Sequence, residues 1–117
     1  MLISFVIPTY NASHSVVRTL SSIFEVSLPK YWKVEAVVVD DGSLDGKALK
    51  QVVDKFANAS LFVHSCNRGM CAARDTGISR TNGDYVCILD ADDELVSGWP
   101  TVLLGIINDC PNTCQVI

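Results

Sequence analysis

Four short runs rich in β-branched and aromatic residues alternate along this chain with segments whose apolar residues recur at helical spacing. That alternation is typical of βαβ units, which build a parallel sheet. The expected strands cover residues 3–7, 34–39, 61–64 and 85–89. Valines fill most of the second run, so this strand is expected to be covered on both faces. The sequence therefore predicts an α/β fold: a Rossmann-like, mostly parallel sheet with helices on both faces.

Helical periodicity fills the intervals between these runs. The two clearest patterns consist of Val16, Leu20, Ile23 and Phe24, and of Leu49, Val52, Val53 and Phe56. Asn11 or Ser13 is expected to cap the first helix. A third helix is predicted over residues 70–79, and a fourth follows Pro100. Residues 115–117 resemble the start of a fifth strand, so we expect one domain, residues 1–117, cut from a longer protein.

The fourth run ends abruptly in acids, with Asp90, Asp92, Asp93 and Glu94 falling within five residues. In an extended backbone Asp90 and Asp92 project from the same side, because side chains alternate along a strand. Two such carboxylates can converge on one divalent cation, whose charge offsets their mutual repulsion. The segment could instead be a solvated acidic loop that caps a helix starting near Trp99.

Polar residues also follow the other three predicted strands. These segments are Thr9-Tyr10-Asn11, Asp40-Asp41-Gly42-Ser43 and Asn67-Arg68-Gly69. In open α/β sheets ligands gather beyond the carboxyl ends of the strands. We therefore expect the three segments and the acidic run to share one edge of the sheet and to form a ligand site there.

Each segment has both a functional and a plain structural interpretation. Tyr10 could stack on a planar ring or be an ordinary turn residue. Asp40 and Asp41 could accept hydrogen bonds from a base or a sugar, or they could be turn and cap residues. The helix that follows Gly69 could present backbone N–H groups to an anion.

Several other polar or aromatic residues are assigned more simply. Arg68 and Arg74 could bind an anion, although a single arginine is more often a surface charge. His14 and His64 have no partner at a catalytic spacing and are interpreted as structural. Trp32 and Trp99 are interpreted as packing residues.

Charge and cysteine content narrow the functional classes. The formal net charge of −4 gives no basis for a broad nucleic-acid-binding surface, so no nucleic-acid partner is expected. The five cysteines are odd in number and do not form close metal-ligand pairs, which favours reduced thiols and a cytoplasmic protein. No apolar run has membrane-spanning length, although other parts of a longer chain could hold the protein at the cytoplasmic face of a membrane.

Together these motifs resemble the nucleotide-binding half of a GT-A-fold glycosyltransferase, specifically the inverting enzymes of family 2. The matching segments are residues 5–11, 37–46, 67–69, 73–78 and 83–93. Their order and spacing cover nearly the whole chain. One departure is Asp75, where the family often has asparagine after arginine.

The resemblance implies roles for the residues at the strand ends. Tyr10 is expected to stack on the nucleobase of a nucleotide-sugar, with Pro8 and Thr9 lining the base pocket. Asp40 is expected to hydrogen-bond the base, with Asp41 close to it. Further donor-binding residues would be Arg68, Gly69 and Arg74.

The acidic run corresponds to the family's DXD motif, Asp90-Ala91-Asp92 in this chain. Asp90 is expected near the ribose and the metal, Asp92 on the metal that bridges the diphosphate, and Asp93 as a further ligand. The cofactor would be Mn²⁺ or Mg²⁺, and a UDP-sugar is the favoured donor on family frequency. The implied function is metal-dependent donor binding for inverting glycosyl transfer.

The resemblance also indicates what this chain lacks. The acceptor would be a saccharide or a lipid-linked molecule, bound by the other half of the enzyme. Glu94 and Asp109 are the only acids after Asp93, and neither lies in a recognisable base motif. The catalytic base is therefore expected beyond Ile117, and the chain alone could be inactive. The oligomeric state is left open.

Two other classes share parts of this pattern. A phospho-receiver domain would use acids at strand ends to hold Mg²⁺, but here Asp40 and Asp41 follow the second strand, and no lysine occurs after Lys55. A dinucleotide-binding Rossmann module would need a Gly-x-Gly-x-x-Gly turn after the first strand, which this sequence does not contain.

Overall fold

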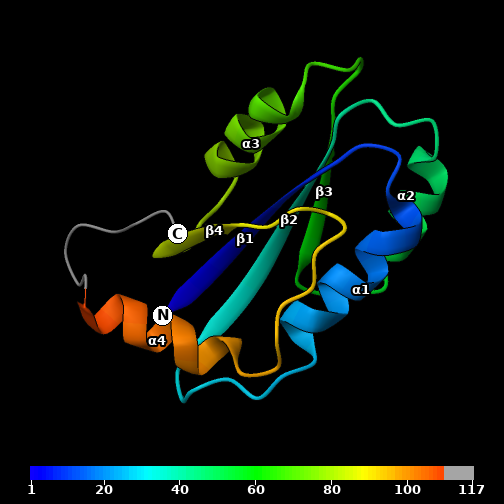
Figure 1. Cartoon of the computed structure of the whole chain (residues 1–117). Coiled ribbons are helices and arrows are strands. Elements are labelled where there is room, and N and C mark those ends of the chain that lie inside the picture. The colour runs from blue at the N-terminus through cyan, green and yellow to red at the C-terminus, as the bar shows by residue number, and fades with distance from the viewer. Residues whose placement is uncertain (110–117) are drawn as a thin grey trace.

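The computed structural model of this chain describes residues 1–109. Strands and helices alternate throughout (Figure 1). The elements are β1 (Leu2–Thr9), α1 (Ser13–Phe24), β2 (Lys33–Asp40), α2 (Gly46–Val53), β3 (Ala59–Val63), α3 (Met70–Ser79), β4 (Tyr85–Ile88) and α4 (Trp99–Asp109). The predicted alternation is confirmed, whereas the fifth strand expected at residues 115–117 lies outside the described residues.

The four strands form one parallel sheet in the order β3-β2-β1-β4. Thr9 at the end of β1 pairs with Asp40 at the end of β2, so these two carboxyl ends are level. The chain adds β2 and β3 on one side of β1 and then places β4 on the other side. The change of direction creates a topological switch point between β1 and β4, where open α/β sheets bind their ligands.

Helices cover both faces of the sheet, as predicted (Figure 1). On one face Phe5 and Ile7 of β1 join a core with residues of α1, α2 and α4. The ring of Trp99 meets that of Phe5 edge-on, with centroids 5.2 Å apart, which confirms Trp99 as a packing residue. On the other face Val37 and Val39 pack with Ala73 of α3.

The expected cap of α1 is wrong. Ala12 occupies the N-cap position, and no side chain caps the helix. Asn11 lies just before it with a left-handed backbone (φ 51°), and its side-chain oxygen accepts a hydrogen bond from the Leu44 N–H instead. Ser13 is the first residue of the helix rather than its cap. The side chain expected at the helix terminus is therefore used to join two loops.

None of the helices within residues 1–109 combines the length and the apolar character that crossing a membrane requires.

Candidate functional site

A cavity of about 490 Å³ lies at the switch point and is lined from three segments of the chain. Pro8 and Tyr10 come from the end of β1 and the turn after it, Arg74 comes from α3, and Asp90 and Asp92 follow β4. The volume falls in the range of about 300–1,000 Å³ that is common for small-molecule sites. The structure thus brings together residues that the sequence analysis selected from three separate motifs.

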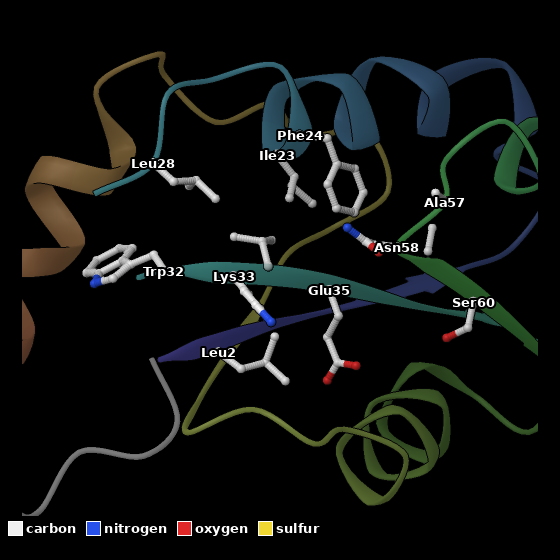
Figure 2. Close-up of a pocket in the computed structure, with 12 residues that line it drawn as sticks. Leu2, Ile23, Phe24, Leu28, Trp32, Lys33, Glu35, Ala57, Asn58 and Ser60 are labelled. Carbon is white, nitrogen blue, oxygen red and sulfur yellow. The ribbon is translucent and has the colours of Figure 1, made fainter. Parts of the chain in front are cut away.

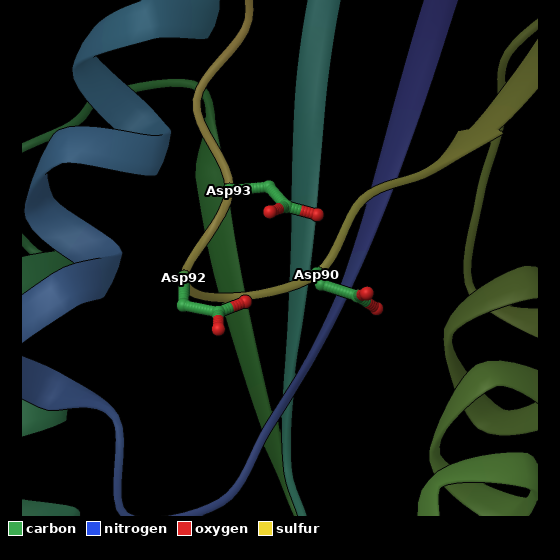
Figure 3. Close-up of side chains that lie close together, drawn as sticks. All are labelled: Asp90, Asp92 and Asp93. Carbon is green, nitrogen blue, oxygen red and sulfur yellow. The ribbon is translucent and has the colours of Figure 1, made fainter.

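The acidic residues after β4 form a turn and not an extended strand. The Asp93 N–H donates to the Asp90 carbonyl at 3.1 Å, and the Ala91 side chain is buried. The carboxylates of Asp90, Asp92 and Asp93 are exposed, and each offers an oxygen within 4.8 Å of the others (Figure 3). The expected convergence is present, but a turn produces it and strand alternation does not.

The three carboxylates have almost no protein partners. The closest cation in the described part of the chain is Arg74, whose Nη2 lies 3.9 Å from Asp90 Oδ1. Within residues 1–109 no hydrogen bond reaches any of these carboxylates, so they do not cap α4 as the alternative interpretation required. Three crowded acids with free oxygens are a suitable ligand set for a hard divalent cation.

Tyr10 lines the cavity with 44% of its surface exposed, so part of this residue is available to a ligand. Thr9, in contrast, is buried and does not line the cavity. Its hydroxyl donates to the Val39 carbonyl at 3.0 Å and ties the end of β1 to β2. The positions of Tyr10 and Pro8 therefore fit a base pocket, whereas the buried Thr9 joins β1 to β2.

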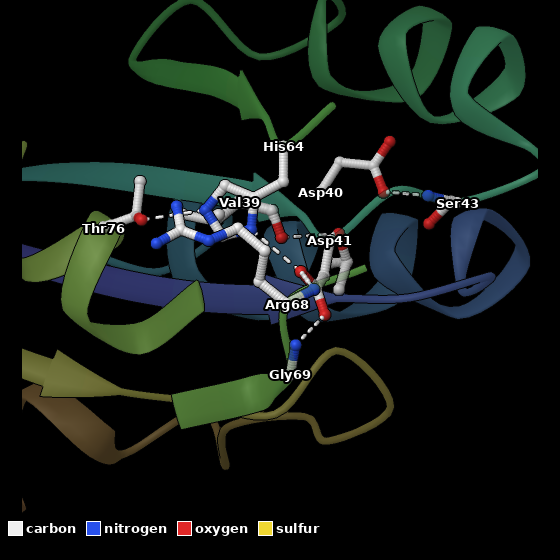
Figure 4. A network of polar contacts seen from close by, with 9 residues as sticks. Val39, Asp40, Asp41, Ser43, His64, Arg68, Gly69 and Thr76 are labelled. Carbon is white, nitrogen blue, oxygen red and sulfur yellow. Dashed lines mark hydrogen bonds and ion pairs between the residues drawn. The ribbon is translucent and has the colours of Figure 1, made fainter. Parts of the chain in front are cut away.

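Asp40 and Asp41 are buried and hydrogen-bonded within the protein (Figure 4). Asp40 Oδ1 accepts from the Ser43 N–H at 2.9 Å. Asp41 accepts from the N–H groups of Arg68 and Gly69, both at 2.8 Å, and its Oδ1 lies 2.8 Å from His64 Nδ1. Neither aspartate lines the cavity, so base contact by Asp40 stays a prediction.

The hydrogen bonds to Asp41 also stabilise its ionised form. Burial by itself raises the pKa of this carboxyl, but the contacts with His64 and with two backbone N–H groups outweigh it, and the pKa is lowered from 3.8. His64 also contacts Thr76 Oγ1 through Nε2 at 2.8 Å, which confirms its structural interpretation. Asp41 thus joins the end of β2 to β3, α3 and the turn that precedes α3.

The turn before α3 is used differently from the expectation. The N–H groups of Arg68 and Gly69 donate to Asp41, so these two are not free to face an anion, and anion binding by the N–H groups of the helix that follows stays a prediction. Gly69 has φ 95°, a backbone conformation that favours glycine, while the Arg68 side chain is exposed. Of the two predicted arginines, only Arg74 lines the cavity.

Besides Ala12 and Ser15, two cavity residues have no counterpart in the predicted site. His14, assigned a structural role from its sequence, is exposed in the first turn of α1 and lines the cavity. Met70 lines it from the first turn of α3. Neither residue belongs to a recognisable motif, and only the positions of the two helix starts could have indicated them.

Hydrogen bonds connect the loop that carries Tyr10 to the loop after β2. The Asn11 N–H donates to Ser43 Oγ and the Leu44 N–H donates to Asn11 Oδ1, both at 2.8 Å. The Ser13 N–H donates to Asp45 Oδ2 at 3.0 Å. Burial opposes ionisation of Asp45, but the hydrogen bonds from Ser13 prevail and lower its pKa. The backbone on either side of Tyr10 is therefore held by residues that follow β2.

A second cavity, of about 720 Å³, lies at the opposite, amino-terminal end of the sheet (Figure 2). Ile23, Phe24 and Trp32 line one part of it, and Lys33 and Glu35 at the start of β2 line another. It contains no cluster of acids and does not lie at the carboxyl ends of the strands. Its larger size does not make it the better candidate, because the convergent functional groups lie at the other end.

Comparisons with known proteins identify many relatives of one kind. The amylovoran biosynthesis glycosyltransferase AmsB of Erwinia amylovora is 40% identical over 95 residues, which cover 78% of this chain and 31% of that protein. The glycosyltransferase AglE of Haloferax volcanii is 33% identical over 99 residues, covering 83% of this chain and 32% of that one. The chain spans about a third of the length of most of these curated relatives, and less of some.

Solved structures give the same result. TarS of S. aureus in complex with UDP-GlcNAc is 27% identical with a TM-score of 0.80, over 93% of this chain and 32% of that one. The mannosyltransferase PcManGT of Pyrobaculum calidifontis, in complex with GDP-Man and Mn²⁺, is 26% identical with a TM-score of 0.80, over 92% of this chain and 32% of that one. The sequence model of glycosyl transferase family 2 matches residues 4–117. This chain therefore belongs to glycosyl transferase family 2, and its α/β sheet is that of the GT-A fold.

Proposed function

We propose that this chain is the donor-binding domain of a metal-dependent, inverting glycosyltransferase, and that it binds a nucleoside-diphosphate sugar in the cavity between β1 and β4. The observation that carries the proposal is the convergence of Tyr10, Arg74, Asp90 and Asp92 on one cavity. Related proteins of known structure hold UDP-GlcNAc or GDP-Man. These ligands support a nucleotide-sugar donor and leave the base open, although we favour uridine.

The cavity offers a suitable group for each part of such a donor. The exposed ring of Tyr10 provides a stacking surface for a base, with Pro8 as the adjoining wall. Arg74 supplies a guanidinium that can bind diphosphate oxygens. Asp90, next to Arg74, and Asp92 line the cavity from the segment after β4, where a cation would separate them from the phosphates.

The acidic residues fit a divalent cation. Asp90, Asp92 and Asp93 are exposed, bring oxygens within 4.8 Å of one another, and accept no hydrogen bond from residues 1–109. We propose all three as ligands of Mn²⁺ or Mg²⁺, supported by the Mn²⁺ in the PcManGT complex. The cation would stabilise the negative charge that develops on the leaving nucleoside diphosphate. It would also let an acidic protein bind an anionic donor, because it reverses the local charge.

The relatives extend well beyond the part that this chain matches. We propose that the catalytic base and the site for a saccharide or lipid-linked acceptor belong to an acceptor-binding half that follows this domain. We also propose a cytoplasmic location, supported by the free thiols of Cys66, Cys71 and Cys87. The comparisons give no support to the phospho-receiver alternative.

Calorimetric titration of the chain with UDP tests the proposal, with and without Mn²⁺. We expect binding that strengthens at least about tenfold when Mn²⁺ is present, because the cation joins the acidic turn to the diphosphate. Asp92→Asn should abolish that gain. Asp54→Asn is the matched control, since Asp54 is an exposed acid that pairs with Lys50 at the end of α2, outside the cavity. Metal-independent binding, or equal effects of the two variants, would refute the metal site.

A further inference from the structure

Three hydroxyl side chains on α1 bind the backbone of the acidic turn. They are Ser15, Thr19 and Ser22, and their spacing of four and three residues places them on one face of the helix. The Thr19 hydroxyl lies 2.9 Å from the Ala91 carbonyl and 2.6 Å from the Asp93 carbonyl. Helix α1 therefore contacts the turn along the side opposite its exposed carboxylates.

The hydroxyls of Ser15 and Ser22 make further hydrogen bonds with the backbone of the same turn. Ser15 Oγ donates to the same Ala91 carbonyl at 2.9 Å, and a carbonyl oxygen can accept two such bonds. Ser22 Oγ accepts from the Leu95 N–H at 3.0 Å. The backbone of the turn is thus fixed at two carbonyls and one N–H between the end of β4 and the start of α4.

Burial makes this contact hard to replace. Thr19 is fully buried and Ser15 is 5% exposed, so water cannot easily take the place of a missing hydroxyl. A carbonyl that loses its donor in such a place keeps the full cost of its desolvation. The geometry of the turn therefore depends on these hydroxyls more than it would at an exposed loop.

The carboxylates oppose the conformation that the hydroxyls hold. Asp90, Asp92 and Asp93 bring negative oxygens within 4.8 Å of one another, and like charges at this distance repel. A loop that is free to move would separate them and would lose conformational freedom when it gathered them around a cation. A loop that α1 already holds in place loses less conformational freedom on binding a cation, so binding costs less free energy.

We propose that Thr19, supported by Ser15, is a positioning residue that holds the acidic turn in a cation-binding conformation before the cation arrives. The inference rests on the proposed function, because it assumes that Asp90, Asp92 and Asp93 bind a divalent cation. It adds a determinant of metal affinity that lies in a different segment of the chain and has no side-chain contact with the metal. If Thr19 had only a structural role, removing its hydroxyl would lower stability but would not weaken Mn²⁺ binding more than metal-free UDP binding.

The test compares Mn²⁺ affinity, followed by the electron paramagnetic resonance signal of free Mn²⁺, with UDP affinity in the absence of metal. Thr19→Val keeps the shape of the side chain and removes the hydroxyl. We expect it to bind Mn²⁺ about tenfold more weakly, as is common when a hydrogen bond that orients metal ligands is lost. Its metal-free UDP affinity should stay within about twofold of the wild type, since Thr19 does not line the cavity.

Two further variants make the result specific. Thr19→Ser retains the hydroxyl and should restore most of the Mn²⁺ affinity. Ser4→Ala removes another fully buried hydroxyl, one that donates to Glu35 in β2 and lies outside the cavity, and it should leave Mn²⁺ affinity unchanged. If Thr19→Val does not fold, Ser15→Ala decides, because it removes only one of the two hydroxyls that contact the Ala91 carbonyl; since Ser15 lines the cavity, its metal-free UDP affinity is measured as well and should stay within about twofold of the wild type. The variant should weaken Mn²⁺ binding a few-fold.

The outcomes separate this inference from the function it assumes. Wild-type protein that binds no Mn²⁺ would overturn the proposed function and this inference together. Wild-type protein that binds Mn²⁺, with unchanged affinity in Thr19→Val, would overturn the inference alone. Equal losses of Mn²⁺ and metal-free UDP affinity, or no recovery in Thr19→Ser, would also overturn it, because they indicate general disruption.

Discussion

Helix α3 packs closely on the sheet at Gly77, and replacing this glycine with alanine tests how tight that packing is. A Cβ atom at position 77 would lie 2.3 Å from Val6 Cγ1 and 3.3 Å from Val39 Cγ2. Both valines are fully buried, so neither side chain has space to withdraw. Gly77→Ala must therefore move α3 outward or force Val6 out of its rotamer.

Two opposing free-energy terms set the expected effect on stability. Overfilling a packed core costs about 1–3 kcal/mol, and a contact as short as 2.3 Å at a fully buried residue places this site in the upper half of that range. Alanine in a helix interior returns about 1 kcal/mol relative to glycine. We expect a net loss of about 1–2 kcal/mol in the free energy of unfolding, or a fall in Tm of roughly 5–10 °C.

Urea and thermal unfolding followed by circular dichroism measure this loss, and Gly105→Ala is the matched control. Gly105 also lies inside a helix, α4, but a Cβ atom there would meet nothing within 4 Å. The control should gain about 0.5–1 kcal/mol, because alanine reduces the freedom of the unfolded chain. Equal changes in the two variants, or no loss in Gly77→Ala, would refute the argument from close packing.

Three further predictions concern the cavity and the loops beneath it. Tyr10→Ala should lose about 1–3 kcal/mol of UDP binding by calorimetry, whereas Tyr10→Phe should keep most of it, because the proposed contact is stacking by an exposed ring. Asn11→Ala should weaken UDP binding more than Asn11→Gly in the same titration, since both lose the bond from Leu44 but only alanine is strained at φ 51°. Because the folded state lowers the pKa of Asp41 from 3.8, its stabilisation is complete above that pH and is lost as the pH falls below it. Unfolding between about pH 5 and pH 3 should therefore show a larger loss of stability in the wild type than in Asp41→Asn; equal losses would contradict the assignment.

The sequence was sufficient to predict the elements because their signals are local. Val34 and the valines at positions 37–39 are buried in β2, so burial on both faces of the sheet explains the continuous apolar run. The helix predicted over residues 70–79 matches α3 (Met70–Ser79). The boundaries of the strands shifted by one or two residues, since their ends depend on which neighbours they pair with.

The roles of single polar residues were harder to predict, because their partners are distant in sequence. Asp41 is bound by N–H groups 27 and 28 residues away, and no sequence pattern indicated that the turn at Arg68 and Gly69 would hold this carboxylate. Thr19 contacts the acidic turn across 72 residues. No spacing rule connects such pairs, whereas the clustering of acids after β4 was evident from adjacent residues, although the turn that brings them together was not.

The acids near the carboxyl ends of the strands fall into two groups according to what their oxygens bind. Asp41 and Asp45 accept hydrogen bonds from backbone N–H groups of other segments and have lowered pKa values, so their charges are used within the fold. Asp90 and Asp92 are exposed, and their nearest cation is Arg74, 3.9 Å from Asp90. A carboxylate already surrounded by N–H donors has little to gain from a cation, whereas a crowded one without donors gains both neutralisation and ligands. The proposed cation is therefore expected at the turn after β4 and not at the acidic segment after β2.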